Sequence, residues 1–258
     1  MKKILLASIL SFAAFSTFAE TGTDPAFAKV EQLMKSKNYN AAYQELDKLA
    51  KTGNAQALYN LAYLTQMGQG TAKDDKKALS LYQQSSAKGY SVASYVLSQS
   101  YTNGELGLAK DAKKSQEFLE KSSAQGFDDA TVELAVLYFS NNEDQKGLQK
   151  LDPLLKKGNL QALHAKALYD LSLGYKTKNE ATFKQGISTI ESLAQKGYTP
   201  ALMTLANMLT NGNILKQNLA EAKKIYTALA AEKIPKAKES LDVVNKLIAE
   251  QAKAPAPK

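Results

Sequence analysis

A short turn motif, in which a glycine is followed four residues later by an alanine, recurs five times along the chain. Its glycines are Gly53, Gly89, Gly126, Gly158 and Gly197, at spacings of 36, 37, 32 and 39 residues. A sixth copy, AEKIPKA from Ala231, has lysine in place of the glycine. A period in this range indicates a solenoid, in which short supersecondary units stack on their neighbours. We therefore expect an array of similar units that share a continuous core.

Each copy of the motif is followed by a pattern typical of two helices. In the first full copy, Ala57, Leu61 and Leu64 fall on one helical face. Asp74 is a suitable N-cap for a second helix, which Gly89 ends as a C-terminal glycine, and Asp111 and Asn218 are predicted N-caps of the second helices in later copies. The fourth copy departs from the others through an enlarged loop around residues 174–179. The pattern predicts an all-α solenoid of about six helix-turn-helix units with a C-terminal capping helix.

A small residue stands five positions after each leading alanine, which indicates that neighbouring helices approach closely there. These residues are Ala62, Ser98, Ala135, Ala167 and Ala206. The repeat domain is predicted over residues 20–251, followed by a disordered tail over 252–258, because that tail is polar and rich in proline. The predicted units are about 27–53, 57–89, 93–126, 130–158, 162–197 and 201–233, with the cap at 235–251.

The N-terminus has the pattern of a secretory signal peptide over residues 1–19. Two lysines precede an uncharged run from Ile4 to Phe18, and the small residues Thr17 and Ala19 suit cleavage after Ala19. The apolar run is short for a membrane span, which needs about 20 residues. We therefore expect a periplasmic protein without a stable membrane anchor, if the source is Gram-negative.

The composition limits the classes of partner. The chain has no cysteine, so an exported form would have no disulfide bonds and would depend on buried surface for stability. All 33 basic residues are lysines, and the formal net charge is +8. Arginine is the usual residue for bidentate contacts to phosphates and bases, so its absence argues against a nucleic-acid partner. The lysines indicate a solvated basic surface.

Longer motifs within the repeats resemble those of the Sel1-like repeat family, which is related to tetratricopeptide repeats. The resemblance rests on the A-x-x-x-L-[small] pattern, on GQGTAKDDKKA at 68–78, on residues 103–115, and on the closing K-G-x-x-x-A. It covers about residues 27–237 and is weakest in the third and fourth units. It implies a right-handed superhelix of helix pairs used for protein–protein contact. Exported members of the family include adapters, regulators and immunity proteins that neutralise secreted toxins.

Enzymatic alternatives have little support from motifs. Three short fragments mimic the signatures of penicillin-recognising serine enzymes, namely Ser85-x-x-Lys88, Tyr101-x-Asn103 and Lys51-Thr52-Gly53. In those enzymes the Lys-Thr-Gly element follows the other two along the chain, whereas here it precedes them. His164 is the only histidine, so a transition-metal site would have to rest on carboxylates alone. We therefore predict no catalytic residues, no metal and no cofactor. The alternative is an envelope enzyme that acts on cell-wall material or β-lactams.

Helical geometry predicts which first-helix residues face a concave groove. Positions 2, 6 and 9 after the leading alanine point away from the apolar stripe at about 100° per residue. The candidate groove residues are Tyr59, Tyr63, Gln66, Tyr95, Gln99, Val132, Val136, Phe139, His164, Met203 and Asn207. Tyrosines and aliphatic side chains are suitable anchors for a protein or peptide. The alternative is that these residues pack against the facing second helices.

The function predicted from the sequence is a non-enzymatic periplasmic interaction module. We expect a monomer that binds a protein partner in its groove, as an adapter or as an inhibitor or immunity protein against a secreted toxin.

Overall fold

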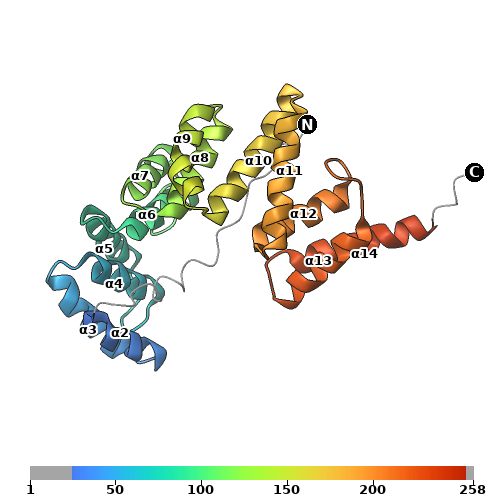
Figure 1. Ribbon diagram of the computed structural model, residues 1–258. Coiled ribbons are helices and arrows are strands. Elements are labelled where there is room, and N and C mark those ends of the chain that lie inside the picture. Colours follow the sequence, from blue (N-terminus) through green and yellow to red (C-terminus); the bar gives the residue numbers. More distant parts are fainter. Residues whose placement is uncertain (1–24, 254–258) are drawn as a thin grey trace, which may run out of the picture. The chain divides into compact units, whose positions relative to one another are not determined.

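The computed structural model describes residues 25–253, and within that range all regular structure is helical (Figure 1). This confirms the predicted all-α fold. The helices are α2 (Pro25–Lys35), α3 (Tyr39–Lys51), α4 (Ala55–Met67), α5 (Asp75–Ala87), α6 (Ser91–Asn103), α7 (Ala112–Ala124), α8 (Asp128–Ser140), α9 (Asp144–Lys156), α10 (Leu160–Thr177), α11 (Glu180–Gln195), α12 (Thr199–Asn211), α13 (Leu219–Ala231) and α14 (Ala237–Lys253). The predicted signal peptide lies outside the described residues.

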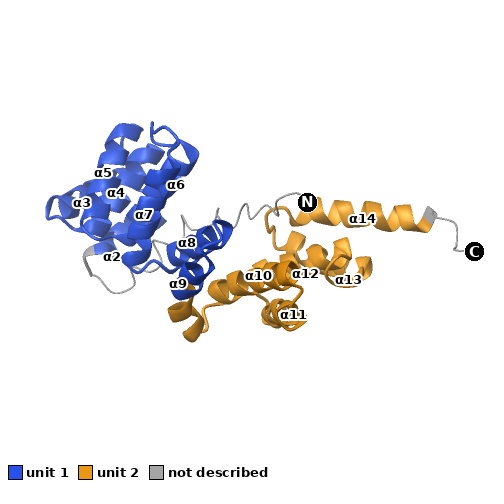
Figure 2. Cartoon of the chain, turned by 90° about the horizontal axis from the view of Figure 1, so that it is seen from above, with its two compact units in different colours: residues 1–150 blue, residues 151–258 orange. Residues whose placement is uncertain are grey.

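The chain divides into two compact units, residues 1–150 and 151–258, called here the N-terminal unit and the C-terminal unit (Figure 2). Within the N-terminal unit, the helices α2 to α8 form consecutive packed pairs, from α2 with α3 to α7 with α8. The same holds from α10 to α14 in the C-terminal unit. Packing between consecutive helices is the defining property of a repeat architecture. The helix pairs α4–α5, α6–α7, α8–α9, α10–α11 and α12–α13 are called here repeats 1 to 5.

The predicted glycine turns are present at the ends of the second helices. Gly53, Gly89 and Gly126 have φ values of 85°, 94° and 92°, in the left-handed region where a side chain is unfavourable. Lys233, which replaces the glycine of the sixth copy, adopts φ 57° at the equivalent turn. The turn geometry is therefore kept even where the residue best suited to it is missing.

The predicted N-caps also form. The side chains of Asp74, Asp111 and Asn218 accept hydrogen bonds from the backbone N–H groups three residues later, at 2.9, 3.0 and 3.1 Å. These bonds satisfy amides that have no partner within the helix. Asp75 and Asp128 each begin a helix, where the helix dipole favours a negative charge.

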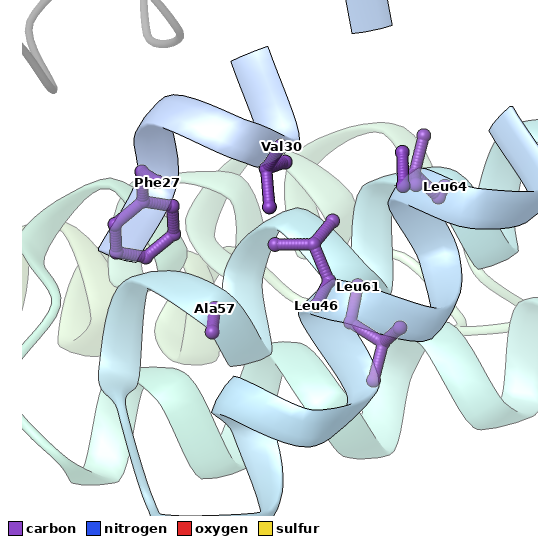
Figure 3. Packing of buried hydrophobic residues seen from close by; sticks show 7 residues of the cluster. Phe27, Val30, Leu46, Ala57, Leu61 and Leu64 are labelled. Carbon is purple, nitrogen blue, oxygen red and sulfur yellow. The ribbon is translucent and has the colours of Figure 1, made fainter. Parts of the chain in front are cut away.

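The core at the start of the N-terminal unit joins three helices (Figure 3). Phe27 and Val30 of α2 pack with Leu46 of α3 and with Leu61 and Leu64 of α4. Each of these side chains is at most 3% exposed. The apolar stripe predicted for the first full repeat is therefore a core face.

The small residue five positions after each leading alanine is buried in every repeat, which confirms the predicted close packing. Ala62, Ala135, Ala167 and Ala206 are 0% exposed and Ser98 is 1% exposed.

Buried or partly buried hydroxyl groups connect repeats 1, 2 and 3 at the contacts between them, and each such contact between consecutive repeats is called here a seam. At the seam between repeats 1 and 2, the Oγ atoms of Ser86 and Ser94 are 2.7 Å apart, and the Oγ of Ser94 donates to Oε1 of Gln125 at 2.5 Å. Nε2 of Gln125 donates to the carbonyl of Ser86 at 3.0 Å. At the next seam, Ser123 and Thr131 form the equivalent hydroxyl pair at 2.9 Å. The seams thus combine apolar packing with specific polar contacts.

Two parts of the fold differ from expectation. The enlarged loop predicted around residues 174–179 is largely helical, because α10 continues to Thr177 and α11 begins at Glu180. The final helix reaches Lys253, two residues into the predicted tail. Alanine and lysine are good helix formers, and the first proline of the tail comes only at Pro255.

Over residues 25–253, none of the helices combines the length and the apolar character that crossing a bilayer requires.

Candidate functional site

Four of the eleven predicted groove residues are buried. Tyr59, Val132 and His164 are 4% exposed and Tyr95 is 5% exposed. The prediction that these side chains line an open groove is therefore wrong. They sit at position 2 after the leading alanine of their repeats.

For Tyr59, Tyr95 and His164, the physical reason is a ring contact with the next repeat. The ring of Tyr59 lies 5.2 Å from that of Tyr90, and the ring of Tyr95 lies 5.1 Å from that of Phe127, measured between centroids. Tyr90 and Phe127 are the residues that directly follow the turn glycines, at the start of the next repeat. In repeats 1 and 2, position 2 therefore packs against the next repeat in the chain and has little surface left for a partner.

His164 occupies the same position in repeat 4 and makes the same contact. Its ring lies 5.8 Å from the ring of Tyr198, which follows Gly197. Its Nε2 lies 3.0 Å from Oγ1 of Thr204 in the next first helix. Burial lowers the pKa of His164 to about 4, so the imidazole is neutral near pH 7. The histidine is a packing residue at the seam between repeats 4 and 5.

Polar side chains also join the first helices of repeats 2 and 3. The hydroxyl of Tyr95 donates to Oε2 of Glu133 at 2.9 Å, and Nε2 of Gln99 donates to Oε1 of the same carboxylate at 3.1 Å. Burial, followed by the nearby Glu133 carboxylate, raises the pKa of Tyr95 far above its usual value. The phenol therefore remains a hydrogen-bond donor to Glu133 at any physiological pH.

The other seven predicted groove residues keep part of their surface. In the N-terminal unit these are Tyr63, Gln66, Gln99, Val136 and Phe139, called here the wall. In the C-terminal unit, Met203 is partly buried and Asn207 is exposed. The wall residues lie on the first helices α4, α6 and α8, and none of them carries a charge.

Some of these residues are positioned by their own second helices. Oε1 of Gln66 accepts a hydrogen bond from the hydroxyl of Tyr82 at 2.9 Å, and Oδ1 of Asn207 accepts one from Tyr226 at 2.8 Å. Phe139 lies against Gly147, since a Cβ on that glycine would be 2.4 Å from the phenylalanine ring. The alternative prediction, packing against second helices, therefore applies in part to these side chains.

The fragments that mimic serine-enzyme signatures have structural roles. The Oγ of Ser85 is buried and donates to the carbonyl of Ala55 at 2.6 Å. Lys88 is the C-cap residue of α5, and Thr52 is the C-cap residue of α3. Ser122 in repeat 2 repeats the contact of Ser85, since it donates to the carbonyl of Ser91 at 2.8 Å. Ser85 is thus a repeat position that fixes the start of the first helix.

Metal binding has no candidate in the part of the chain that the structure describes. No group of three or more His, Asp or Glu side chains is placed there to hold an ion.

Comparison with known proteins gives a repeat family and a fold. The Sel1 repeat model matches residues 55–90, 91–127 and 199–233, which correspond to repeats 1, 2 and 5. No protein of curated function matches the sequence.

Solved structures that are similar to this chain include the following three. A protective antigen of uropathogenic Escherichia coli that displays an SLR fold is 23% identical, with a TM-score of 0.63; the match covers 81% of this chain but only 45% of the antigen. A Sel1 repeat protein from Oxalobacter formigenes is 20% identical, with a TM-score of 0.67, over 92% of this chain and 100% of that one. Pseudomonas aeruginosa protein 5086 is 18% identical, with a TM-score of 0.51, over 84% and 86% of the two chains. At these identities the likeness shows the fold.

Proposed function

For a chain that contains three Sel1 repeats within an all-α solenoid, we propose the role of a non-enzymatic interaction protein that binds a protein partner on its first helices. The observation that carries this proposal is the wall. Tyr63, Gln66, Gln99, Val136 and Phe139 give three consecutive first helices an uncharged, partly accessible surface with aromatic and amide groups. Such surfaces suit partner recognition, because aromatic side chains supply contact area at a small entropic cost.

The site of action we propose is the periplasm. The signal-peptide pattern of residues 1–19 supports it. Within that compartment the chain would serve as an adapter or as an inhibitor, for example an immunity protein against a delivered toxin. A C-terminally tagged full chain expressed in a Gram-negative host tests the location. We expect it in the periplasmic fraction, with an intact mass that begins at Glu20; a chain retained in the cytoplasm at full mass would contradict the proposal.

Partner binding can be tested with charge inserted into the wall. In the variant Thr102→Lys/Val136→Lys, one lysine replaces wall residue Val136 and the other replaces exposed Thr102, beside the wall on α6. The matched control, Gln83→Lys/Gln145→Lys, adds the same charge at exposed positions of second helices. Affinity purification of each tagged protein from a periplasmic extract, followed by mass spectrometry, identifies the proteins retained.

We expect one protein to be retained in stoichiometric amount by the wild type and by the control, and to be lost from the wall variant. Retention by all three proteins would show that the partner binds elsewhere. Absence of any retained protein, under conditions in which the tagged chain is folded by circular dichroism, would overturn the proposal.

The enzymatic alternative is tested separately. Because Ser85 is buried and hydrogen-bonded to a backbone carbonyl, we expect a fluorescent penicillin to leave the protein unlabelled. Covalent labelling that disappears in Ser85→Ala would establish the alternative instead.

A further inference from the structure

The helix pair of repeat 4 is longer than its counterparts. Nine helices of the described chain, namely α3 to α9, α12 and α13, have 13 residues each. In contrast, α10 has 18 residues and α11 has 16. At 1.5 Å per residue, these additions lengthen the two helices by about 7 Å and about 4 Å.

The added length lies at one end of the pair. Helix α10 begins at Leu160, two residues before the leading alanine of its repeat, as α4 and α12 do. Helix α11 ends at Gln195, two residues before its turn glycine, as α5 does. The extra residues are therefore at the junction of α10 and α11. This end, residues 173–184, is called here the tip.

The tip is a well-packed structure. A Cβ on Gly174 would lie 2.5 Å from the backbone nitrogen of Phe183, so the two helices touch at this glycine. The side chain of Asn179 caps α11 by accepting from the N–H of Thr182 at 3.1 Å, and the carbonyl of Gly174 accepts from the N–H of Asn179 at 2.9 Å. Insertions in a repeat often form part of a binding face.

The surface of the tip combines an aromatic ring with a hollow. Tyr175 is 67% exposed, the highest value among the exposed large hydrophobic residues of the described chain. Next to it, a hollow of about 480 Å³ is lined by Gly174, Tyr175, Lys178, Glu180 and Phe183. An exposed tyrosine beside an apolar hollow is suited to hold one side chain of a partner.

Charge determines which partner the tip suits. Residues 25–150 contain 15 lysines and 14 acidic residues, a net charge of +1, whereas residues 151–253 contain 15 lysines and 9 acidic residues, a net charge of +6. At the tip, Glu180 is held by Lys184 at 2.8 Å. Lys176 and Lys178 are exposed and form no ion pair with another described residue. The charge available to a partner is therefore positive.

We propose that the tip is a second docking site, formed by Tyr175, Lys176, Lys178 and Phe183, and that its occupant is an acidic protein segment with an aromatic or aliphatic anchor side chain. The anchor occupies the hollow beside Tyr175, and the flanking carboxylates lie near Lys176 and Lys178. Because lysine ammonium groups act as point charges, the contact depends strongly on ionic strength. The site uses no residue of the wall.

The chain has no tryptophan, so a tryptophan in a probe peptide reports binding without interference. The probe is a 12-residue peptide with a central Trp-Leu pair flanked by glutamates and aspartates. A second peptide has lysines in place of the acidic residues and keeps the tryptophan. A third peptide has serines in place of the Trp-Leu pair and therefore carries a separate fluorescent label. Each is titrated with the full-length mature protein while fluorescence anisotropy is recorded.

We expect the acidic peptide with its anchor to bind at least 10-fold more tightly than either of the other two peptides. Lys176→Glu/Lys178→Glu should weaken binding at least 10-fold, and Tyr175→Ser about 5-fold. The controls make equivalent changes at exposed positions elsewhere in the C-terminal unit. They are Lys196→Glu/Lys238→Glu for charge and Val243→Ser for apolar surface, and they should change the affinity less than 2-fold.

Equal weakening by both lysine pairs would show diffuse attraction to the net charge and overturn the site. An affinity for the acidic peptide that stays unchanged in Lys176→Glu/Lys178→Glu and in Tyr175→Ser would also overturn the site. Tighter, lysine-dependent binding to phosphatidylglycerol vesicles or to a single-stranded oligonucleotide than to the acidic peptide would assign the tip to a different class of partner and overturn the proposed occupant. None of these results affects the test of the wall, which uses different variants and a different readout.

Discussion

Tyr95 and Glu133 join the first helices of consecutive repeats through a hydrogen bond of 2.9 Å from phenol to carboxylate. Within repeat 1, a tyrosine on the second helix has a neutral acceptor on the first, since the hydroxyl of Tyr82 donates to the amide oxygen of Gln66 at 2.9 Å. The two bonds have the same length and a similarly buried donor, and they differ in the charge of the acceptor.

This difference predicts unequal effects of removing the two hydroxyl groups. A hydrogen bond to a charged group contributes about 2 kcal/mol to stability, whereas a neutral one contributes about 1 kcal/mol. We therefore expect Tyr95→Phe to lower the free energy of unfolding by about 2 kcal/mol and Tyr82→Phe by about half as much. Urea unfolding followed by circular dichroism measures both. A larger loss for Tyr82→Phe would contradict the role assigned to Glu133.

Gly174 is predicted to be essential for the approach of α10 and α11. In Gly174→Ala, the new Cβ would lie 2.5 Å from the nitrogen and 2.8 Å from the Cα of Phe183, and backbone atoms cannot move aside without separating the helices. We expect a loss of about 2–3 kcal/mol, in line with other overpacked sites. Ser172→Ala, at an exposed position of the same helix, is the control and should be neutral or slightly stabilising. Similar melting temperatures for the two variants would refute the close contact.

His164 predicts a pH dependence of stability. Its pKa is about 4 in the folded protein, below the ordinary value of 6.5, so the unfolded chain binds the proton first as the pH falls. The stability contributed by the neutral ring is therefore fully present above pH 6.5 and is lost progressively between pH 6.5 and pH 4. From pH 7 to pH 5 the loss should be about 2 kcal/mol, since each pKa unit corresponds to about 1.4 kcal/mol.

The matched variant for this test is His164→Gln, which keeps a polar group near Thr204 but does not titrate. Urea unfolding at pH 7 and pH 5 should show a smaller pH dependence in His164→Gln than in the wild type. Identical dependence in the two proteins would mean that other groups account for it.

Lys233 offers a stabilising substitution. Its φ of 57° lies in the left-handed region, which disfavours residues with a side chain by about 1 kcal/mol. Lys233→Gly should therefore raise the free energy of unfolding by about 1 kcal/mol.

The reverse change, Gly89→Ala, tests the same principle from the other side. Gly89 has φ 94° and no heavy atom within 4 Å of the position a Cβ would occupy, so the cost is purely conformational, about 1 kcal/mol. Thermal unfolding of both variants should give shifts of opposite sign. Shifts in the same direction would exclude backbone strain as the cause.

The sequence was sufficient for the features that a single repeat determines. The glycine spacing, the caps at Asp74, Asp111 and Asn218, and the buried small residues all depend on one turn or one helix, and the structure confirms them. These features follow from local geometry, which a repeated sequence displays several times over.

The predicted groove was less accurate because it depends on neighbouring repeats. Angles around one isolated helix placed Tyr59 and Tyr95 opposite the apolar stripe, but the next repeat covers that side through Tyr90 and Phe127. A signal for this contact is present in the sequence, as an aromatic residue directly after the turn glycine at 90, 127 and 198. The length of α10 had no comparable signal, since Gly174 suggested a loop and instead permits a close helix contact.

The hydroxyl cluster of Ser86, Ser94 and Gln125 has a consequence for folding fidelity. A chain of similar copies can dock a helix pair on the wrong neighbour, which is a characteristic error of repeat proteins. If repeat 3 were to stack directly on repeat 1, Thr131 would stand where Ser94 does, and Nε2 of Gln125 would lose its acceptor in repeat 1, the carbonyl of Ser86. The correct order of copies is the one that gives the partly buried Gln125 amide its acceptor in repeat 1, so the cluster favours correct assembly in a way that apolar packing alone would not.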